Sequence, residues 1–279
     1  DITLAASRVA ERHNFPMVAT GAASSTIWQQ GFSNIFQIDA PAAKYMELPL
    51  KLANEKGLKR IALVYADTDF PREVADGVRA MAAGYGMPLV LDEAYAQDGR
   101  DFSAIARRLK ASGPQVVIAG TYFDDSVALV RATRQVGLQP EMMVMTVGPA
   151  QEDFGRQLGD AAEGVMGATS WMRSGKMPLA YDFSFRFKQK YGHNAAAHAA
   201  YGYAGGQVLE AAVRLAGSLD RAAIREQLQT MTFRSLLGHY HVDEAGSQIA
   251  KQTYVMQWQG GKRLLVLPEN IAESTVEIP

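Results

Sequence analysis

Hydrophobic and polar positions along the middle of the chain follow a pattern that predicts alternating β-strands and α-helices. Short apolar runs are typical of buried strands, and a segment with helical spacing follows each of them. We expect strands at 60–66, 88–91, 115–120 and 142–147, and helices at 71–85, 102–112 and 126–136. Such parallel winding places ligand contacts at the carboxyl ends of strands, here at 20–25, 66–70, 121–125 and 146–150.

The flanking regions add further elements and predict a discontinuous domain. At the N-terminal side we expect a helix over 1–14, strands over 15–19 and 35–38, and a helix over 41–56. After a strand at 164–169 we expect helices at 181–191, 195–216 and 220–230, then strands at 238–242, 253–257 and 264–267. The first helix leads into a strand, yet no strand precedes it, so we expect the chain to begin inside a domain.

The stretch from Pro16 to Trp28 is the first candidate for chemistry. A short apolar strand runs into a turn of small residues at Gly21, Ala22 and Ala23. Small side chains allow a ligand to approach the backbone, and the hydroxyls of 24–26 can cap a short helix ending near Gly31. Free N–H groups at a helix start favour an anion. The alternative is an ordinary strand-to-helix loop.

Composition limits the classes of function. The chain has 279 residues, of which 48% are hydrophobic and 20% charged, so we expect about two domains with real cores. The formal net charge of −1 gives no electrostatic case for nucleic acid. Cysteine is absent, which excludes disulfides and thiol chemistry. No apolar run is long enough to span a membrane, and we expect that any export signal peptide has been removed.

No enzyme or metal motif stands out. The sequence has no GxSxG elbow, no Walker lysine loop, no GxGxxG after a strand and no HExxH helix. His239 and His241 alternate on one strand and form at most half a metal site. We expect no catalytic residue, no metal and no cofactor. Trp28 and the methionines at 142, 143 and 145 are expected in cores, and Gly205 and Gly206 are expected to allow close packing.

Several runs resemble one family, the solute-binding proteins of branched-chain amino-acid-type ABC transporters. These runs are Thr3-Leu4-Ala5-Ala6-Ser7, 16–25, 59–65, Asp101-Phe102-Ser103, Val136-Gly137-Leu138, 160–164, 203–209, 257–262 and Pro268-Glu269. The resemblance implies the type I periplasmic-binding-protein fold: α/β, with two doubly wound lobes, parallel central sheets and crossover strands joining them. Lobe one is expected at 1–40 plus 171–250, incomplete at its N-terminus, and lobe two at 41–170 plus 251–279.

The resemblance also implies a ligand site in a cleft between the lobes. Backbone and hydroxyl donors of the loop matching Gly21, Ala22, Ala23 and Ser24 hold the ligand's carboxylate in this family. A threonine common in that loop falls on Ala23, so one hydroxyl is absent unless Ser24 or Thr20 replaces it. In the second lobe, Phe70 lies where a tyrosine is frequent, and Tyr122 matches a tyrosine of the cleft.

The departure from the family concerns the amine of an amino-acid ligand. Amino-acid binders pair the ammonium with a carboxylate after the strand equivalent to 142–147, because an unpaired buried cation is costly. Val147 occupies that place here. Asp124 or Asp125 could substitute, although acids at a helix start more often interact with the helix dipole. We therefore expect a carboxylate ligand with an apolar body, an aromatic acid first and an amino acid next.

Three further residues complete the expected site. Trp171 and Tyr201, with Phe70 and Tyr122, could supply stacking surface, although packing at the hinge is the alternative for Trp171. His198 lies where relatives place cleft residues, and a structural role is its alternative.

These expectations define a periplasmic binding protein that captures a small carboxylate by lobe closure. The expected partners are the ligand and the permease subunits of an ABC importer, through which alone the protein would approach a membrane. We expect a monomer and no nucleic acid. The alternatives are a ligand-sensing receptor or regulator domain of the same fold, or an α/β enzyme.

Overall fold

The chain forms two compact units, each built from two separate stretches of sequence. The computed structural model describes residues 2–98, 101–177 and 179–278. The first unit comprises Asp1–Ala42 and Ser170–Gln252, and the second comprises Ala43–Thr169 and Thr253–Pro279. The chain therefore passes from one unit to the other three times, after residues 42, 169 and 252. Asp1, the expected start of the first helix, lies outside the described residues.

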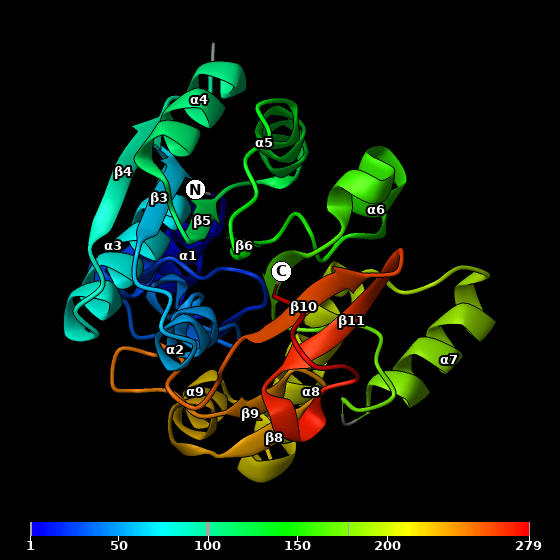
Figure 1. Ribbon diagram of the computed structural model, residues 1–279. Helices are drawn as coiled ribbons and strands as arrows, with labels where there is room; N and C mark the ends of the chain where they lie inside the picture. Colours follow the sequence, from blue (N-terminus) through cyan, green and yellow to red (C-terminus); the bar gives the residue numbers. More distant parts are fainter. Residues whose placement is uncertain (1, 99–100, 178, 279) are drawn as a thin grey trace. The chain divides into compact units, whose positions relative to one another are not determined.

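A seven-stranded sheet forms the centre of the second unit (Figure 1). Its strands, in spatial order, are β11 (Lys262–Leu267), β10 (Tyr254–Gln259), β7 (Val165–Thr169), β6 (Met142–Met145), β5 (Val116–Gly120), β3 (Ile61–Ala66) and β4 (Leu89–Tyr95). Neighbours from β7 to β4 run parallel, whereas β10 runs antiparallel to both β7 and β11. The predicted α/β class with a mostly parallel central sheet is confirmed.

Helices cover both faces of this sheet. Figure 1 shows α4 (Phe102–Ser112), α5 (Phe123–Gln135) and α6 (Glu152–Leu158) in a row along one side. On the other side α3 (Asp69–Gly84) packs on β3, and α2 (Glu47–Glu55) packs on α3. Short 3₁₀ turns lie at Ala42–Lys44, Gly159–Ala162 and Glu269–Ile271. The sequence pattern did not predict α6.

The single helix predicted over 41–56 is wrong. The structure has a 3₁₀ turn at Ala42–Lys44 and a separate helix that begins at Glu47. Pro49 is the third residue of this helix, in the first turn, where a missing N–H costs little. In one continuous helix from Pro41, Pro49 would instead lie in the interior and remove a hydrogen bond.

The centre of the sheet is apolar and fully buried. Every residue of β5 is buried, and β3 is buried except for Tyr65. Met142, Met143 and Met145 of β6 are at most 4% exposed, which confirms their predicted place in the core. Burial on both faces is what a parallel sheet covered by helices requires.

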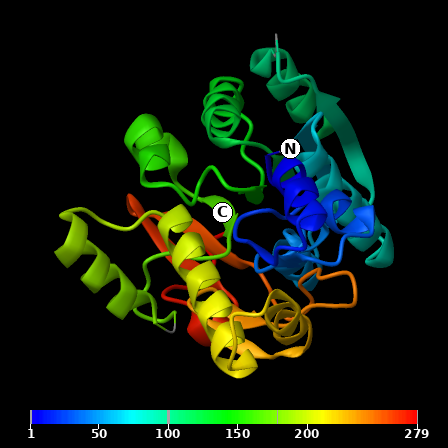
Figure 2. The same ribbon diagram turned by 180° about the vertical axis from the view of Figure 1, so that it is seen from behind.

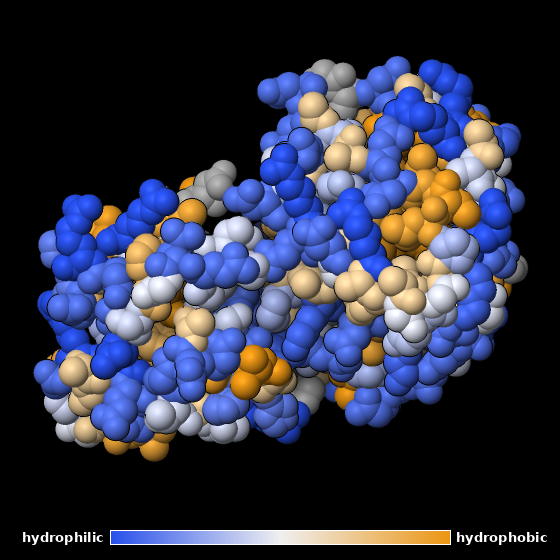
Figure 3. Space-filling model, turned by 90° about the vertical axis from the view of Figure 1, so that its left-hand side faces the viewer, coloured by the Kyte–Doolittle hydropathy of each residue, from blue (hydrophilic) through white to orange (hydrophobic). Residues whose placement is uncertain are grey.

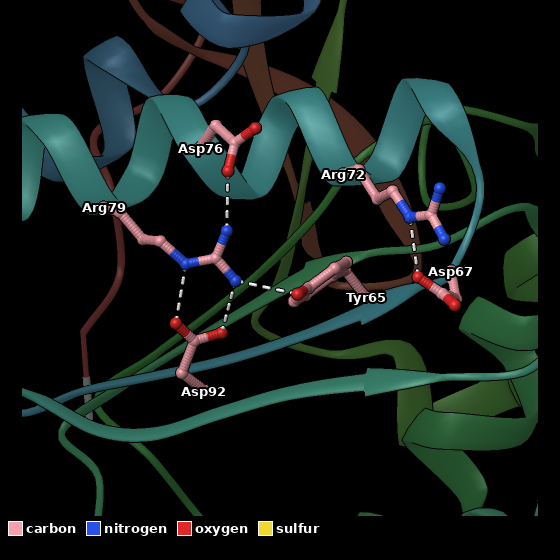
Figure 4. A network of polar contacts seen from close by, with 6 residues as sticks. All are labelled: Tyr65, Asp67, Arg72, Asp76, Arg79 and Asp92. Carbon is pink, nitrogen blue, oxygen red and sulfur yellow. Dashed lines mark hydrogen bonds and ion pairs between the residues drawn. The ribbon is translucent and has the colours of Figure 1, made fainter.

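Two arginines of α3 fix this helix to the sheet (Figure 4). The Arg79 guanidinium donates to both carboxylate oxygens of Asp92 on β4, at 2.7 and 2.8 Å. It also donates to the Tyr65 hydroxyl of β3 at 2.7 Å, and Asp76 accepts a further bond. Hydrogen bonding to Asp92 raises the pKa of Arg79. These hydrogen bonds fix the position of α3 relative to both strands.

The second arginine contact lies at the start of the same helix. Arg72 donates from Nε to a carboxylate oxygen of Asp67 at 2.6 Å (Figure 4), and this hydrogen bond lowers the pKa of Asp67. Asp67 directly follows β3, so the contact joins the strand end to the first turn of α3. That turn includes Phe70, one of the predicted site residues.

The first unit contains two small sheets and four α-helices among its described residues. Its helices are α1 (Ile2–Arg12), α7 (Ala180–Tyr191), α8 (Ala197–Ala216) and α9 (Arg221–Thr230), with a 3₁₀ helix at Ser25–Gln30. Strands β1 (Met17–Ala19) and β2 (Ile35–Gln37) pair in parallel, and β8 (Phe233–Ser235) and β9 (Gly238–Tyr240) pair antiparallel. The long helix α8 packs beside α9 (Figure 2). The sequence pattern did not predict β8.

A small apolar cluster surrounds the first sheet. Trp28 is 5% exposed and packs with Ala19, Ile27 and Ile35, and its indole N–H donates to the Ile35 carbonyl at 3.1 Å. The predicted core role of Trp28 is confirmed.

One face of the molecule, drawn in Figure 3, offers no simple indication of function. On the face drawn in Figure 3, hydrophilic residues predominate and hydrophobic residues gather in separate patches. Such patches are ordinary, because much of any protein surface is apolar. No helix in the described part of the chain is both long and apolar enough to cross a bilayer.

Candidate functional site

The turn at Gly21–Ser24 follows β1, and its backbone is held through its carbonyl groups. The Ala22 carbonyl accepts a hydrogen bond from the Gln37 side-chain amide at 3.1 Å, and the Ala23 carbonyl accepts one from the Ala42 N–H at 2.8 Å. Among the described residues, the N–H groups of this turn donate no hydrogen bond. A backbone fixed through its acceptors, with its donors unused, suits an anionic ligand.

Gln37 is the residue that positions this turn, and the sequence analysis missed it. Its side chain is fully buried at the end of β2, between the apolar Phe36 and Ile38. Its side-chain oxygen accepts from the Ser247 hydroxyl and the Gln248 N–H, both at 3.0 Å. A glutamine within an apolar run was the available signal, because a buried amide needs several partners.

The predicted capping by the Ser24 hydroxyl is wrong. Ser24 is the N-cap of the 3₁₀ helix Ser25–Gln30, but its side chain makes no capping hydrogen bond. The Ser24 and Thr26 hydroxyls instead bond to each other at 3.0 Å. These two short side chains, two residues apart in sequence, satisfy one another, and the helix N–H groups gain no cap from Ser24.

Helix α8 approaches this turn closely because of one glycine. A Cβ atom on Gly205 would lie 2.4 Å from Thr20 Cγ2, so only glycine fits without a shift. Gly206 has no neighbouring atom within 4 Å of its Cβ position, so the close packing predicted for it is wrong. One turn earlier on α8, the Tyr201 ring lies 3.5 Å from the Cβ position of Gly21.

The Tyr201 ring therefore lies beside the turn, and its hydroxyl group is hydrogen-bonded within the protein. The hydroxyl hydrogen-bonds with Ser170 and faces Asp39. Removal from water, with a contribution from the Asp39 charge, raises the pKa of Tyr201 well above its usual range. The neighbouring His198 is exposed, with its ring 5.8 Å from that of Tyr201. Tyr201 and His198 thus lie in the same unit as the turn, with Tyr201 beside the turn and His198 beside Tyr201.

Trp171 belongs to the same unit but lies in its core. It is 2% exposed, and its ring packs edge-on against Phe183 of α7 at 5.6 Å between centroids. This burial agrees with the packing alternative named for Trp171.

In the second unit, two predicted aromatic residues form a cluster with a third. Phe70 in the first turn of α3 lies 6.3 Å from Tyr122, centroid to centroid, and 5.2 Å from Tyr45. Tyr45 is 3% exposed and Tyr122 is 38% exposed, so the cluster runs from the core to the surface. The sequence analysis missed Tyr45, which precedes α2 and carried no motif.

Val147 lies on the adjoining strand end of this unit. It is half-buried and follows β6, beside the loop that contains Tyr122. The Thr146 hydroxyl accepts from the Thr121 N–H at 3.0 Å and donates to the Thr121 carbonyl, which ties the two loops together. The Thr121 hydroxyl in turn bonds with that of Ser126 at 2.7 Å. The ends of β5 and β6 are thus tied together by hydroxyl and backbone groups.

The two acids named as substitutes are placed by helix α5. This helix begins at Phe123, so the loop predicted over 121–125 is shorter, and Asp124 and Asp125 lie in the first turn. Asp125 is 3% exposed and accepts a hydrogen bond from the Tyr95 hydroxyl at 2.9 Å. Asp124 is exposed. Asp125 is therefore engaged in the fold of its own unit.

The predicted site residues thus fall into two groups, one in each unit. The first contains the turn 21–24 with Tyr201 and His198, and the second contains Phe70, Tyr122 and Val147. Across the described ranges, no group of three or more metal-ligating side chains gathers.

Comparison with known proteins places the chain in a family. A family model described as periplasmic binding protein matches residues 1–262. The chain belongs to this family, and the predicted resemblance to binding proteins of branched-chain amino-acid-type transporters is confirmed.

Individual relatives agree with this assignment. The Leu/Ile/Val-binding protein homolog 7 of Brucella melitensis is 24% identical over 295 residues, covering 99% of this chain and 74% of the relative. A branched-chain amino acid transporter substrate-binding protein of Streptococcus pneumoniae, in complex with isoleucine, has a TM-score of 0.81 at 19% identity, covering 99% and 76%. A solute-binding protein of R. palustris, in complex with benzoate, has a TM-score of 0.80 at 16% identity, covering 99% and 77%. At these identities the structural matches show the fold alone.

Proposed function

We propose that this protein is the extracytoplasmic, periplasmic binding component of an ABC importer, and that it captures a small carboxylate without catalysing a reaction. The family membership supports the binding role and the importer, whose permease subunits would receive the ligand. We propose an aromatic acid as the first ligand class and a branched-chain or other amino acid as the second.

The observation that supports binding of a carboxylate is the turn at Gly21–Ser24. Its carbonyls are engaged by Gln37 and Ala42, whereas its N–H groups donate no hydrogen bond among the described residues. In this proposal the turn binds the carboxylate, because several backbone donors stabilise an anion strongly. The rings of Phe70, Tyr122 and Tyr201 cover the apolar body of the ligand.

The apolar residue Val147 at the position of the amine partner supports an aromatic acid over an amino acid. Val147 occupies the position of the acid in amino-acid binders, and Asp125 is bonded to Tyr95. An ammonium group buried beside Val147 would lack a counter-charge, which is costly. Among the structural relatives, one was solved with benzoate and another with isoleucine, so the fold accommodates both classes.

Binding would be coupled to a change from an open to a closed form, and the permease would recognise the closed form. A ligand shifts this equilibrium only through contacts that it makes better in the closed form. The turn and the rings provide two separate sets of contacts for this purpose.

The test is to give the protein an amine partner. Calorimetry with benzoate and with leucine should show tighter binding of benzoate to the wild type. Val147→Asp should tighten leucine binding by about 10- to 100-fold, since a hydrogen bond to a charged group contributes about 1.5–3 kcal/mol. The same variant should weaken benzoate binding, because two carboxylates then repel each other.

Val147→Asn is the matched control, because it has the same shape without the charge and should not favour leucine. A wild type that binds leucine and ignores aromatic acids would refute the ligand class. A wild type that binds neither class would refute the carboxylate-binding proposal.

A further inference from the structure

Three buried polar residues lie next to the three points at which the chain passes between units. Asp39 lies just before the passage at 42/43, Ser170 is the first residue after the passage at 169/170, and Lys251 is the last but one before 252/253. All three belong to the first unit, and they are 1%, 0% and 5% exposed. Buried charged residues are rare unless they are paired.

These residues are in direct contact with one another. The Ser170 hydroxyl donates to an Asp39 carboxylate oxygen, which also accepts from the Ala40 N–H at 2.8 Å. The Lys251 ammonium donates to the Ser170 carbonyl at 3.3 Å and to the Leu237 carbonyl. Three segments far apart in sequence are therefore joined by one set of hydrogen bonds.

Charge balance explains why this cluster is stable. Burial lowers the pKa of Lys251 to about 8, and the facing charge of Asp39 opposes that shift. Asp39 is a charged group that faces this lysine, and Asp39 also faces Tyr201 of α8. A buried ion needs both a counter-charge and hydrogen-bond partners, and the cluster supplies both.

Tyr201 connects this cluster to the proposed ligand site. Its hydroxyl hydrogen-bonds with Ser170, and its ring lies beside the turn at Gly21. The bond to Ser170 engages the polar end of the side chain within the protein. A ligand at the turn therefore meets the ring, which is apolar.

We propose that Asp39 and Ser170, with Lys251 as the buried counter-charge, are positioning residues that hold Tyr201 so that it presents its ring to the ligand and keeps its hydroxyl engaged. This inference rests on the proposed function and deepens it: the site selects ligands whose body is apolar beside the carboxylate. Tyr201 is therefore hydrogen-bonded to a cluster whose three members each lie next to one of the passages between the units.

The experiment is a double-mutant cycle on Ser170 and Tyr201, read out as the affinity for benzoate and as the thermal midpoint. Ser170→Ala and Tyr201→Phe each remove the bond between the two side chains and keep the ring. We expect each to weaken benzoate binding by about fivefold, the effect of one hydrogen bond. The loss in the double variant should be smaller than the sum of the two single losses, because both substitutions remove the same bond between the two side chains.

Ser184→Ala is the matched control. Ser184 of α7 belongs to the same unit and is 7% exposed, but its hydroxyl has no hydrogen-bond partner among the described residues. Its removal should leave both the affinity and the midpoint unchanged or slightly improved. The comparison separates the loss of a buried hydroxyl from the loss of a positioning contact.

A second arm tests the counter-charge. Asp39→Asn keeps the shape and removes the negative charge that faces Lys251. It should lower the thermal midpoint, and adding Lys251→Met should restore part of the loss because the unpaired cation is then gone.

The outcomes separate this inference from the proposed function. Benzoate binding that is unchanged in Ser170→Ala and Tyr201→Phe would overturn the positioning role and leave the carboxylate-binding proposal standing. Additive losses in the double variant, or an Asp39→Asn variant as stable as the wild type, would also overturn it. A wild type that binds neither benzoate nor leucine would refute both.

Discussion

Helix α8 packs closely on the residue that precedes the candidate turn, and a substitution at Gly205 tests this packing directly. In Gly205→Ala, the new Cβ atom would lie 2.4 Å from Thr20 Cγ2, whereas carbon atoms in contact lie about 3.5–4.0 Å apart. Thr20 or the helix must therefore shift by about 1 Å. Overpacking of this kind costs about 1–3 kcal/mol, partly offset by about 1 kcal/mol from the better helix propensity of alanine.

Gly206→Ala provides the matched control on the same helix. Nothing lies within 4 Å of its Cβ position, so only the helix propensity changes. We expect Gly206→Ala to be more stable than the wild type by up to about 1 kcal/mol, and Gly205→Ala to be less stable by about 1 kcal/mol. Thermal unfolding followed by circular dichroism should resolve this difference, since 1 kcal/mol shifts the midpoint of a domain this size by about 2–4 °C.

Thr20→Ser completes the test because it removes Cγ2, the atom in the way. Combined with Gly205→Ala, it should restore much of the lost stability. Because Thr20 directly precedes Gly21, Gly205→Ala should also weaken ligand binding, and the second substitution should recover it. Equal stability of the two alanine variants, or no rescue by Thr20→Ser, would refute the close packing of α8 on the turn.

Two further predictions concern other parts of the molecule. Tyr122→Ala should weaken ligand binding by about 5- to 30-fold, which corresponds to about 1–2 kcal/mol of ring contact, and should leave the midpoint nearly unchanged because Tyr122 is 38% exposed. Tyr85→Ala is its control at 37% exposure, and an unaltered affinity in Tyr122→Ala would remove this ring from the site. Relative to Lys251→Met, the free energy of unfolding of the wild type should rise between about pH 8 and 10.5. In that range Lys251 still binds a proton in the unfolded protein but has lost it in the folded protein. The difference should approach 3 kcal/mol across that window and stay flat below it in chemical denaturation curves, and parallel curves for the two proteins would contradict a buried Lys251.

Where local signals are strong, the sequence predicted the fold closely. The helix over 102–112 has the predicted bounds at both ends. The Asp101 side chain accepts hydrogen bonds from the Ser103 and Ala104 N–H groups at its start, and Gly113 adopts a positive φ of 57° at its end. Caps of this kind depend only on adjacent residues, so they are visible in one sequence.

Elements that depend on distant partners were harder to predict. Strand β8 is three residues long and forms only by pairing with β9. The first unit was expected to contain a parallel central sheet, whereas its described residues form only a parallel pair and an antiparallel pair. Short strands have weak patterns of their own, because their stability comes from their neighbours.

The candidate site shows the same division between local and distant signals. The small residues of the turn and the rings at the strand ends were recognisable from position and family resemblance, and their role in binding stays a prediction. Gln37 and the Asp39, Ser170 and Lys251 cluster were not recognised. Each is a single polar residue in sequence, and at least one of its hydrogen-bond partners lies more than 80 residues away.

The discontinuous second unit has a consequence for the order of folding during synthesis. Strand β7 ends at Thr169, but its partner β10 begins only at Tyr254. While the intervening residues are being made, one edge of β7 has open backbone donors and acceptors, and such an edge is prone to pairing with other chains. Strand β10 closes this edge once it has been made, so we expect loss of the segment from Thr253 onward to leave β7 open and to promote aggregation.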